Sequence, residues 1–182
     1  MLKEDIQRTW KMAKGGRLNR FLACCGAPGV QAVVVLRFGQ WLIGKPWPLQ
    51  IFLLPIYYVL SFMIRAVWGI DIPRSTRIGP GFYIGHYGGI FISSAVRIGG
   101  RFTVSQQVVI GVAGHGESRG CPTIGDNVYI APGAKLYGKI AIGDNVKIGP
   151  NAVVDQDLPD NAIAVLDPGF KIVSFKGNPI ED

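Results

Sequence analysis

His86, one of only two histidines in the chain, has a partner and surroundings suited to general-base chemistry. It lies in the segment Ile84-Gly-His-Tyr-Gly-Gly-Ile90, where a neutral imidazole at a turn can accept the proton of a hydroxyl. Asp71 stands fifteen positions before it. A carboxylate on the far ring nitrogen would fix the tautomer and stabilise the imidazolium. The pair predicts base catalysis; the alternative is an ordinary surface histidine near an ordinary turn aspartate.

A six-residue repeat must position these two side chains. Helices place apolar residues about 3.6 positions apart and strands about 2 apart, whereas a period of six is typical of a parallel β-helix built from hexapeptides. Three hexads make a coil of about 18 residues, so Asp71 is expected on the coil next to His86. The thirteen repeat positions are all large and apolar: Ile72, Ile78, Ile84, Ile90, Val96, Phe102, Val108, Ile124, Ile130, Leu136, Ile142, Ile148 and Val154.

The repeat is interrupted once. Val108 and Ile124 lie sixteen positions apart, where twelve would keep the register, so a surplus of four is expected in a loop at 113–122. Loops carried on a rigid scaffold often hold functional residues. His115 and Arg119 lie in this loop and are candidates for contact with a substrate; the alternative is a pair of solvated loop side chains.

Charge divides the chain into an N-terminal region, residues 1–70, and a β-helix, residues 71–165, followed by a C-terminal tail at 166–182. The first region holds nine Lys and Arg against two acids, while the remainder is neutral. It also contains an uncharged run from Pro46 to Ile64, slightly shorter than the roughly 20 residues of a membrane span and interrupted by prolines, which break helices. We expect a helical region that associates with a membrane surface, peripheral or monotopic. The alternative is a helical domain that buries its apolar faces within an oligomer.

Other classes of protein fit the composition poorly. The basic residues are interleaved with too much aliphatic surface for a nucleic-acid face. The apolar run near the N-terminus follows several charges, unlike a signal peptide, and three cysteines make no disulfide framework. Two histidines cannot supply a three-histidine zinc site, so no metal is expected. The predicted location is the cytoplasmic face of the inner membrane.

Several segments resemble the catalytic region of the serine O-acetyltransferases. These are Asp71-Ile-Pro, Ile84-Gly-His86-x-x-Gly89-Ile90 and Cys121-Pro-x-Ile124-Gly-Asp-Asn-Val. That family pairs an Asp and a His at the same separation, so the resemblance implies His86 as general base and Asp71 as its partner. It covers residues 68–173 and looks most similar to the branch that O-acetylates exopolysaccharide, capsule or colanic-acid-type units.

The resemblance also implies a left-handed β-helix and a homotrimer with acetyl-CoA in the groove between two β-helices. The acceptor oxygen would attack the thioester directly, without an acyl-enzyme, and backbone N–H groups at a turn would steady the oxyanion. Carried over by position, the residues expected near acetyl-CoA are Gly111, Val112, Ala131, Pro132, Lys147 and Pro150. For Lys147, the alternative is a solvated turn residue.

The chain departs from this family where the amino-acid acceptor would be held. Gly85 replaces an Asp directly before the histidine, and Gly120-Cys121 replaces Arg-His before Pro122. A site without those charges is expected to bind serine poorly. With Gly85 leaving room for a bulkier acceptor, we predict transfer to a sugar hydroxyl of a surface polysaccharide or its lipid-linked glycan precursor. The alternatives are a serine or other small-molecule O-acetyltransferase, and a non-catalytic β-helix scaffold.

Overall fold

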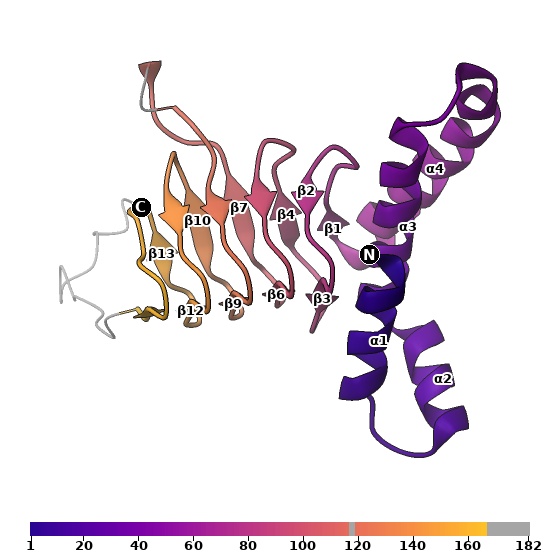
Figure 1. Cartoon of the computed structure of the whole chain (residues 1–182), viewed down its shortest axis with the longest axis horizontal. Helices are drawn as coiled ribbons and strands as arrows, with labels where there is room; N and C mark the ends of the chain where they lie inside the picture. The colour runs from indigo at the N-terminus through magenta and orange to yellow at the C-terminus, as the bar shows by residue number, and fades with distance from the viewer. Residues whose placement is uncertain (117–118, 167–182) are drawn as a thin grey trace, which may run out of the picture.

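The protein is a parallel β-helix whose N-terminal end is covered by a layer of helices (Figure 1). The computed structural model describes residues 1–116 and 119–166, so two residues of the predicted loop and nearly all of the predicted tail lie outside it. The helices are α1 (Leu2–Met12), α2 (Arg17–Gly26), α3 (Pro28–Ile43) and α4 (Trp47–Trp68). The strands are β1 (Ile70–Asp71), β2 (Arg77–Ile78), β3 (Tyr83–Ile84), β4 (Ile90–Ile92), β5 (Arg97–Ile98), β6 (Thr103–Val104), β7 (Val109–Gly111), β8 (Thr123–Ile124), β9 (Tyr129–Ile130), β10 (Lys135–Tyr137), β11 (Ala141–Ile142), β12 (Lys147–Ile148), β13 (Val153–Val154) and β14 (Ile163–Ala164).

The strands form three parallel sheets that make the three faces of the coil. Sheet A has the order β1-β4-β7-β10-β13, sheet B the order β2-β5-β8-β11, and sheet C the order β3-β6-β9-β12-β14. The chain passes from A to B to C and back to A in each coil as far as β13, after which an isolated bridge from Leu158 to Ile142 takes the place of a sheet B strand before β14. The turns from C to A, residues 85–89, 105–107, 131–133 and 149–151, are called the C–A corner. The turns from A to B, which include the loop at 112–122, are called the A–B corner.

Most hexads direct two apolar side chains into the core. The register of the repeat in the structure therefore differs from the register predicted from the sequence. Twelve of the thirteen predicted positions are buried, the exception being the partly buried Ile72. However, Ile70 pairs with Ile90, twenty positions later, whereas Phe91 pairs with Val109, only eighteen positions later. The first coil is therefore longer by two, and the insertion lies between β3 and β4. The six-residue spacing continues across it only because Ile90 and Ile92 both face the core.

The predicted loop is longer than the sequence spacing indicated. Val109 pairs with Lys135, and Lys135 pairs with Val153, so the coil that holds the loop exceeds the following coil by eight positions. The prediction of a surplus of four was wrong for two reasons. It counted from Val108, whereas Ile110 is the matching inward position, and it allowed two hexads before Ile124, whereas the next coil makes the same step, from Leu136 to Ile142, in one. A short antiparallel bridge, in which Ala113 and Gly120 exchange backbone hydrogen bonds, closes the base of the loop.

The helical layer closes the open N-terminal end of the β-helix. Ala32, Val33 and Leu36 of α3 belong to the same buried cluster as the β-helix core. Gly29 makes this approach possible, because a Cβ there would lie 2.6 Å from the carbonyl oxygen of Ile84. The end of a β-structure exposes unpaired backbone groups, so a cover of this kind must satisfy them as well as exclude water.

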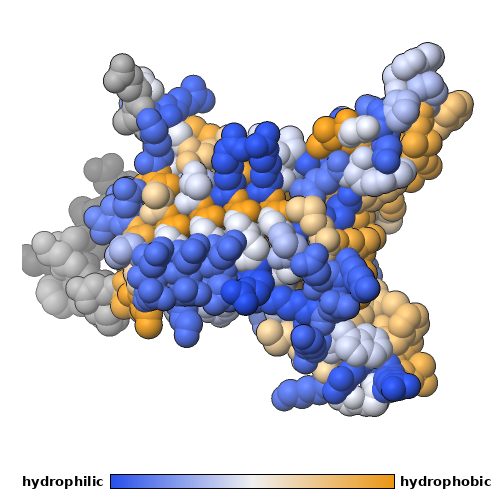
Figure 2. Space-filling view, viewed as in Figure 1, coloured by the Kyte–Doolittle hydropathy of each residue, from blue (hydrophilic) through white to orange (hydrophobic). Residues whose placement is uncertain are grey.

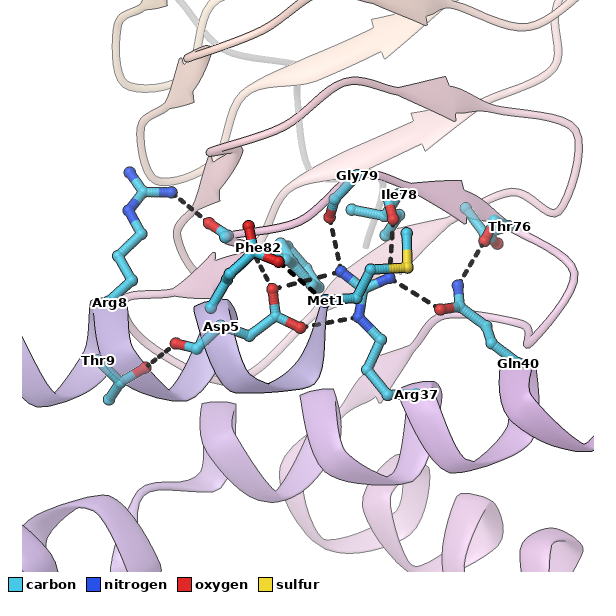
Figure 3. A network of polar contacts seen from close by, with 12 residues as sticks. Met1, Asp5, Arg8, Thr9, Arg37, Gln40, Thr76, Ile78, Gly79 and Phe82 are labelled. Atoms are coloured by element: carbon cyan, nitrogen blue, oxygen red, sulfur yellow. Dashed lines mark hydrogen bonds and ion pairs between the residues drawn. The ribbon is translucent and has the colours of Figure 1, made fainter.

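A buried ion pair between Asp5 and Arg37 satisfies backbone groups at this end of the β-helix (Figure 3). The Arg37 Nε donates to Asp5 Oδ2 at 2.8 Å, and the same guanidinium donates to the carbonyl oxygens of Ile78 and Gly79 at 2.7 and 2.6 Å. Asp5 in turn accepts a hydrogen bond from the backbone N–H of Phe82 at 2.8 Å. Both charged side chains are almost wholly buried. The pair therefore joins α1, α3 and the first coil into one unit.

Helix α4 is the most exposed apolar element. It begins next to Pro46 and Pro48 and continues through Pro55, so the prolines that argued against a long helix do not end it. Among the described residues it is the one helix long and apolar enough, by length and composition alone, to cross a membrane. The pair α2 and α3, bent by 65°, passes the same test as one broken span. Only 6% of the most apolar 18-residue stretch of α4 is buried.

Candidate active site

His86 lies at the C–A corner of the first coil, immediately after β3, and its side chain is exposed to solvent. The two-residue insertion of this coil falls at the same corner. Gly88 and Gly89 take positive φ values of 101° and 67°, which side chains rarely adopt, and so shape the widened turn. The turn is held to the next coil by a hydrogen bond from the Gln107 N–H to the Gly88 carbonyl oxygen at 2.7 Å. The corner therefore presents the imidazole outward on a fixed backbone.

Asp71 is positioned by the end of α4. Gly69 ends this helix in the left-handed conformation, and β1 begins at the next residue. Asp71 is partly buried and pairs across the first two coils with Phe91, which follows His86 closely in the chain. In the part of the chain that the structure describes, no hydrogen bond or ion pair joins the two side chains. Both residues belong to the first coil, Asp71 in its opening strand β1 and His86 in the turn that closes it, rather than to neighbouring coils as predicted. The bond between their side chains stays a prediction.

An aromatic contact that the sequence reasoning missed links this corner to the helices. The rings of Tyr87 and Trp68 meet edge to face with centroids 5.1 Å apart. The Trp68 Nε1 donates to Gln31 Oε1 at 3.0 Å, which fixes the indole against α3. A Tyr directly after the candidate base and a Trp shortly before Asp71 were the available signals. The contact supports the widened turn from the helical side.

The residues predicted near acetyl-CoA fall into separate places. Pro132 and Pro150 lie at the C–A corner, below His86 along the axis. From the coil of β3 to that of β12 is three strand steps of about 4.8 Å, so this row spans roughly 14 Å. Ala131 is buried and its N–H is donated to the Ile148 carbonyl oxygen at 2.9 Å, so it offers a ligand neither its side chain nor its N–H.

The other predicted contacts lie across the molecule at the A–B corner. Gly111 ends β7 and Val112 is exposed, and a Cβ added to Gly111 would meet no atom within 4 Å. His115 and Arg119 are exposed in the loop beyond them. A face of sheet A separates this corner from the C–A corner that holds His86, Pro132 and Pro150.

Lys147 lies on the outer face of sheet C in a hollow of about 350 Å³ that also contains Arg8 and Arg101. Arg8 reaches this face from α1 and donates to the carbonyl oxygens of Gly81 and Phe102 and to Thr103 Oγ1. Burial, and next the positive charge of Arg101, lower the pKa of the Arg8 guanidinium from its ordinary value. Three cations in one hollow suit a polyanionic ligand such as the phosphates of CoA. The sequence reasoning identified Lys147 and missed the two arginines.

Cys121, which stands where the family has a histidine, faces inward. It packs against the hydrophobic core, and its Sγ lies 3.6 Å from Ser93 Oγ. Among the residues described, no group of three or more His, Cys, Asp or Glu side chains is placed to hold a metal ion.

Comparison with known proteins defines the class. Residues 121–156 match the family described as bacterial transferase hexapeptide (six repeats). The chain is similar to the serine acetyltransferases of Bacillus subtilis (34% identity over 177 residues, 95% of this chain and 76% of the relative) and Helicobacter pylori (36% over 141 residues, 76% and 77%). It is also similar to that of Synechococcus elongatus, with 34% identity over 142 residues, 78% of this chain and 56% of the relative. The chain belongs to the serine acetyltransferase family.

Solved structures agree with this assignment. A serine acetyltransferase of Entamoeba histolytica, in complex with cysteine, superimposes with a TM-score of 0.75 at 28% identity over 95% of this chain and 59% of that one. A serine acetyltransferase in complex with CoA gives a TM-score of 0.71 at 25% identity, over 92% of this chain and 66% of that one. The predictions of a left-handed β-helix and of an acetyl-CoA-dependent acyltransferase are confirmed.

The predicted polysaccharide acceptor was wrong. The curated relatives and solved neighbours are serine acetyltransferases, and none of these similarities supports the exopolysaccharide, capsule or colanic-acid branch. The prediction depended on charges that are absent at Gly85, Gly120 and Cys121 and on the apolar helices. Missing charges show that one mode of amino-acid binding is lost, but they do not identify another acceptor.

Proposed function

We propose that this protein transfers acetyl from acetyl-CoA to the hydroxyl of L-serine or a similarly small acceptor. The observation that supports it best is the exposed His86 at the widened C–A corner, with the turns that hold Pro132 and Pro150 below it along the same edge. The histidine faces the solvent where an acceptor can approach. The row below can guide an extended pantetheine arm toward it.

In this mechanism the chain's own groups move a single proton. His86 takes the proton from the acceptor hydroxyl while the oxygen attacks the thioester carbonyl carbon directly. The tetrahedral intermediate collapses, the carbon–sulfur bond breaks, and the imidazolium returns the proton to the leaving CoA thiolate. Asp71 orients the ring and stabilises its charged form, and backbone N–H groups at a turn steady the oxyanion. The acetyl group passes to the acceptor without a covalent enzyme intermediate.

The working form in this proposal is a homotrimer. Gly111 and Val112 at the A–B corner lie a sheet face away from the C–A corner that holds His86. A neighbouring copy would bring its own A–B corner against this C–A corner and close a groove between them. Lys147, Arg8 and Arg101 would then hold the CoA phosphates near the entrance.

Association with the cytoplasmic face of the inner membrane is a further part of the proposal. It is supported by the excess of Lys and Arg over acids in residues 1–70 and by the exposed apolar surface of α4. Catalysis itself does not depend on it, since acetyl-CoA and the small acceptor are both water-soluble.

The proposed activity is tested with purified protein, acetyl-CoA and a panel of acceptors: L-serine, L-threonine, L-homoserine and a soluble monosaccharide. We expect release of the CoA thiol to depend on L-serine or another small hydroxyl compound, with one O-acetylated product formed per thiol. Thiol release can be followed with a disulfide reagent and the product by mass spectrometry. Acetyl-CoA consumption that no small acceptor increases would contradict the proposal.

A substitution at Gly85 tests how the amino acid is held. Gly85→Asp is expected to lower KM for L-serine by about tenfold, because it supplies a carboxylate for the ammonium group beside His86. The backbone tolerates the change, since Gly85 lacks a positive φ and its Cβ would approach no atom closer than 3.7 Å. Gly85→Asn is the matched uncharged control and is expected to leave KM near the wild-type value. An unchanged or raised KM for Gly85→Asp would show that the ammonium is held elsewhere.

A further inference from the structure

The four helices enclose an apolar groove that the catalytic mechanism does not use. Its volume is about 760 Å³, and α1, α2, α3 and α4 all contribute to its walls. The side chains that matter here are Phe21, Val34, Leu60, Met63, Val67 and Trp68. Gln31 is the one residue with a side-chain amide among the described residues that line the groove. Its oxygen accepts from Trp68 Nε1 and its nitrogen donates to the Cys25 carbonyl oxygen. The walls therefore suit an apolar occupant.

The groove opens into a wider apolar surface on the same layer. Phe52, Ile56, Val59 and Phe62 of α4 each expose half or more of their surface. Figure 2 shows hydrophobic residues along the outer side of the helical layer, turned away from the β-helix, in both of its arms. Soluble monomers rarely expose contiguous apolar patches beyond a few hundred Å². A surface of this kind is expected to be covered by a partner.

The distribution of charge selects the partner. Of the two acids in residues 1–70, Asp5 is buried in its ion pair with Arg37, so the exposed charge of the layer is strongly positive. On α2, the exposed Leu18, Phe21 and Leu22 alternate with Arg17 and Arg20. Two such layers would repel one another, whereas an anionic lipid surface complements both the charge and the apolar faces.

Aromatic side chains lie where a bilayer interface would meet the layer. Trp41 and Trp47, at the turn between α3 and α4, are exposed by 48% and 74%. Lys45 lies between them, with its ammonium 4.6 Å from the Trp41 ring centroid. Tryptophan beside lysine is typical of the headgroup region, where the ring needs an apolar side and a wet side.

We propose that the groove holds an acyl chain of an anionic phospholipid and docks the helical layer on one leaflet. This deepens the membrane association proposed above and rests on it. The layer covers the N-terminal end of the β-helix, so docking would direct the axis of the coil away from the bilayer (Figure 1). Trp68 lines the groove and also contacts Tyr87 beside His86. An occupied groove therefore supports the corner that carries the candidate base.

Vesicle binding of the full-length protein tests the proposal. Phosphatidylglycerol–phosphatidylcholine vesicles are expected to co-sediment with the protein, and pure phosphatidylcholine vesicles to bind at least about tenfold more weakly. The double substitution Met63→Glu with Val67→Glu places carboxylates at exposed groove positions and is expected to weaken anionic-vesicle binding by at least about tenfold. Val153→Glu with Val165→Glu is the matched control, because these exposed valines lie on the β-helix, and it is expected to bind as the wild type does.

Phospholipids with brominated acyl chains separate the groove from general surface binding. Quenching of the protein's tryptophan fluorescence is expected, and Trp68→Phe is expected to remove a distinct part of it. Binding with quenching unchanged by Trp68→Phe and by the glutamates would overturn the groove while leaving membrane association in place. No vesicle binding, together with oligomers that the glutamates dissociate, would overturn the proposal in favour of a second copy. Acetyl transfer measured without lipid keeps these outcomes separate from failure of the catalytic proposal.

Discussion

His86→Ala is expected to lower kcat for acetyl transfer by about 10²- to 10⁴-fold, with KM for acetyl-CoA changed only a few-fold. A hydroxyl is a weak nucleophile at neutral pH, and an imidazole that removes its proton in the transition state acts only on the chemical step. His86 lies on a corner fixed by the bond between Gln107 and Gly88, and its side chain is exposed, so its loss is not expected to disturb folding. Steady-state release of the CoA thiol gives kcat and KM directly.

Two variants make this result specific. Asp71→Asn is expected to lower kcat as well, since an amide in place of the carboxylate no longer stabilises the imidazolium. His115→Ala removes the other imidazole of the chain, from an exposed position in the loop at the opposite corner, and is expected to affect kcat far less. A His86→Ala enzyme that keeps a tenth or more of the wild-type kcat would remove this residue from the role of base.

The sequence predicts the core of the β-helix well because the core is local and periodic. An apolar side chain at every sixth position has one way to stack, so residues eighteen positions apart share a face in the structure as in the pattern. Examples are Ile124 with Ile142, Ile130 with Ile148 and Leu136 with Val154. The period does not reveal where residues are inserted. Ile90 and Ile92 both face inward, so a two-residue insertion beside His86 leaves the spacing of six intact. The fifteen-residue spacing of Asp71 and His86 was therefore interpreted for a coil of regular length. The coil that contains both residues is two residues longer.

The parts that were not predicted depend on contacts between distant segments. Arg8 reaches Thr103 across 95 positions, and Trp68 reaches Gln31 across 37, without any periodicity to reveal them. One signal was available for the ion pair at the top of the coil. Asp5 is the last acid before Asp71, and Arg37 follows an uncharged apolar run from Phe21 to Leu36. Isolated opposite charges in apolar surroundings are candidates for pairing, because burying either one alone is costly.

Substitutions in the buried ion pair of Asp5 and Arg37 are expected to have the second large effect, a loss of stability. Asp5→Ala and Arg37→Ala are each expected to lower the free energy of unfolding by about 3–5 kcal/mol, because each leaves an uncompensated buried charge. The loss extends beyond the two side chains. Without Asp5 the Phe82 N–H has no acceptor, and without Arg37 the carbonyl oxygens of Ile78 and Gly79 lose their donor. Urea unfolding followed by circular dichroism measures the change. Hydrogen exchange at the amides of residues 79–83 is expected to rise in both variants.

An exposed ion pair serves as a control that separates the effect of burial on the free energy of unfolding from the effect of charge pairing. The Met1 ammonium and Glu4 Oε1 lie 3.0 Å apart on the same helix as Asp5, but both side chains are more than half exposed. Glu4→Ala is therefore expected to change the free energy of unfolding by less than about 1 kcal/mol. The double variant Asp5→Ala with Arg37→Ala is expected to lose less than the sum of the single losses, since neither charge is then left alone. Additive losses, or single losses as small as that of Glu4→Ala, would mean that the helices stay on the first coil by apolar packing of α3 alone.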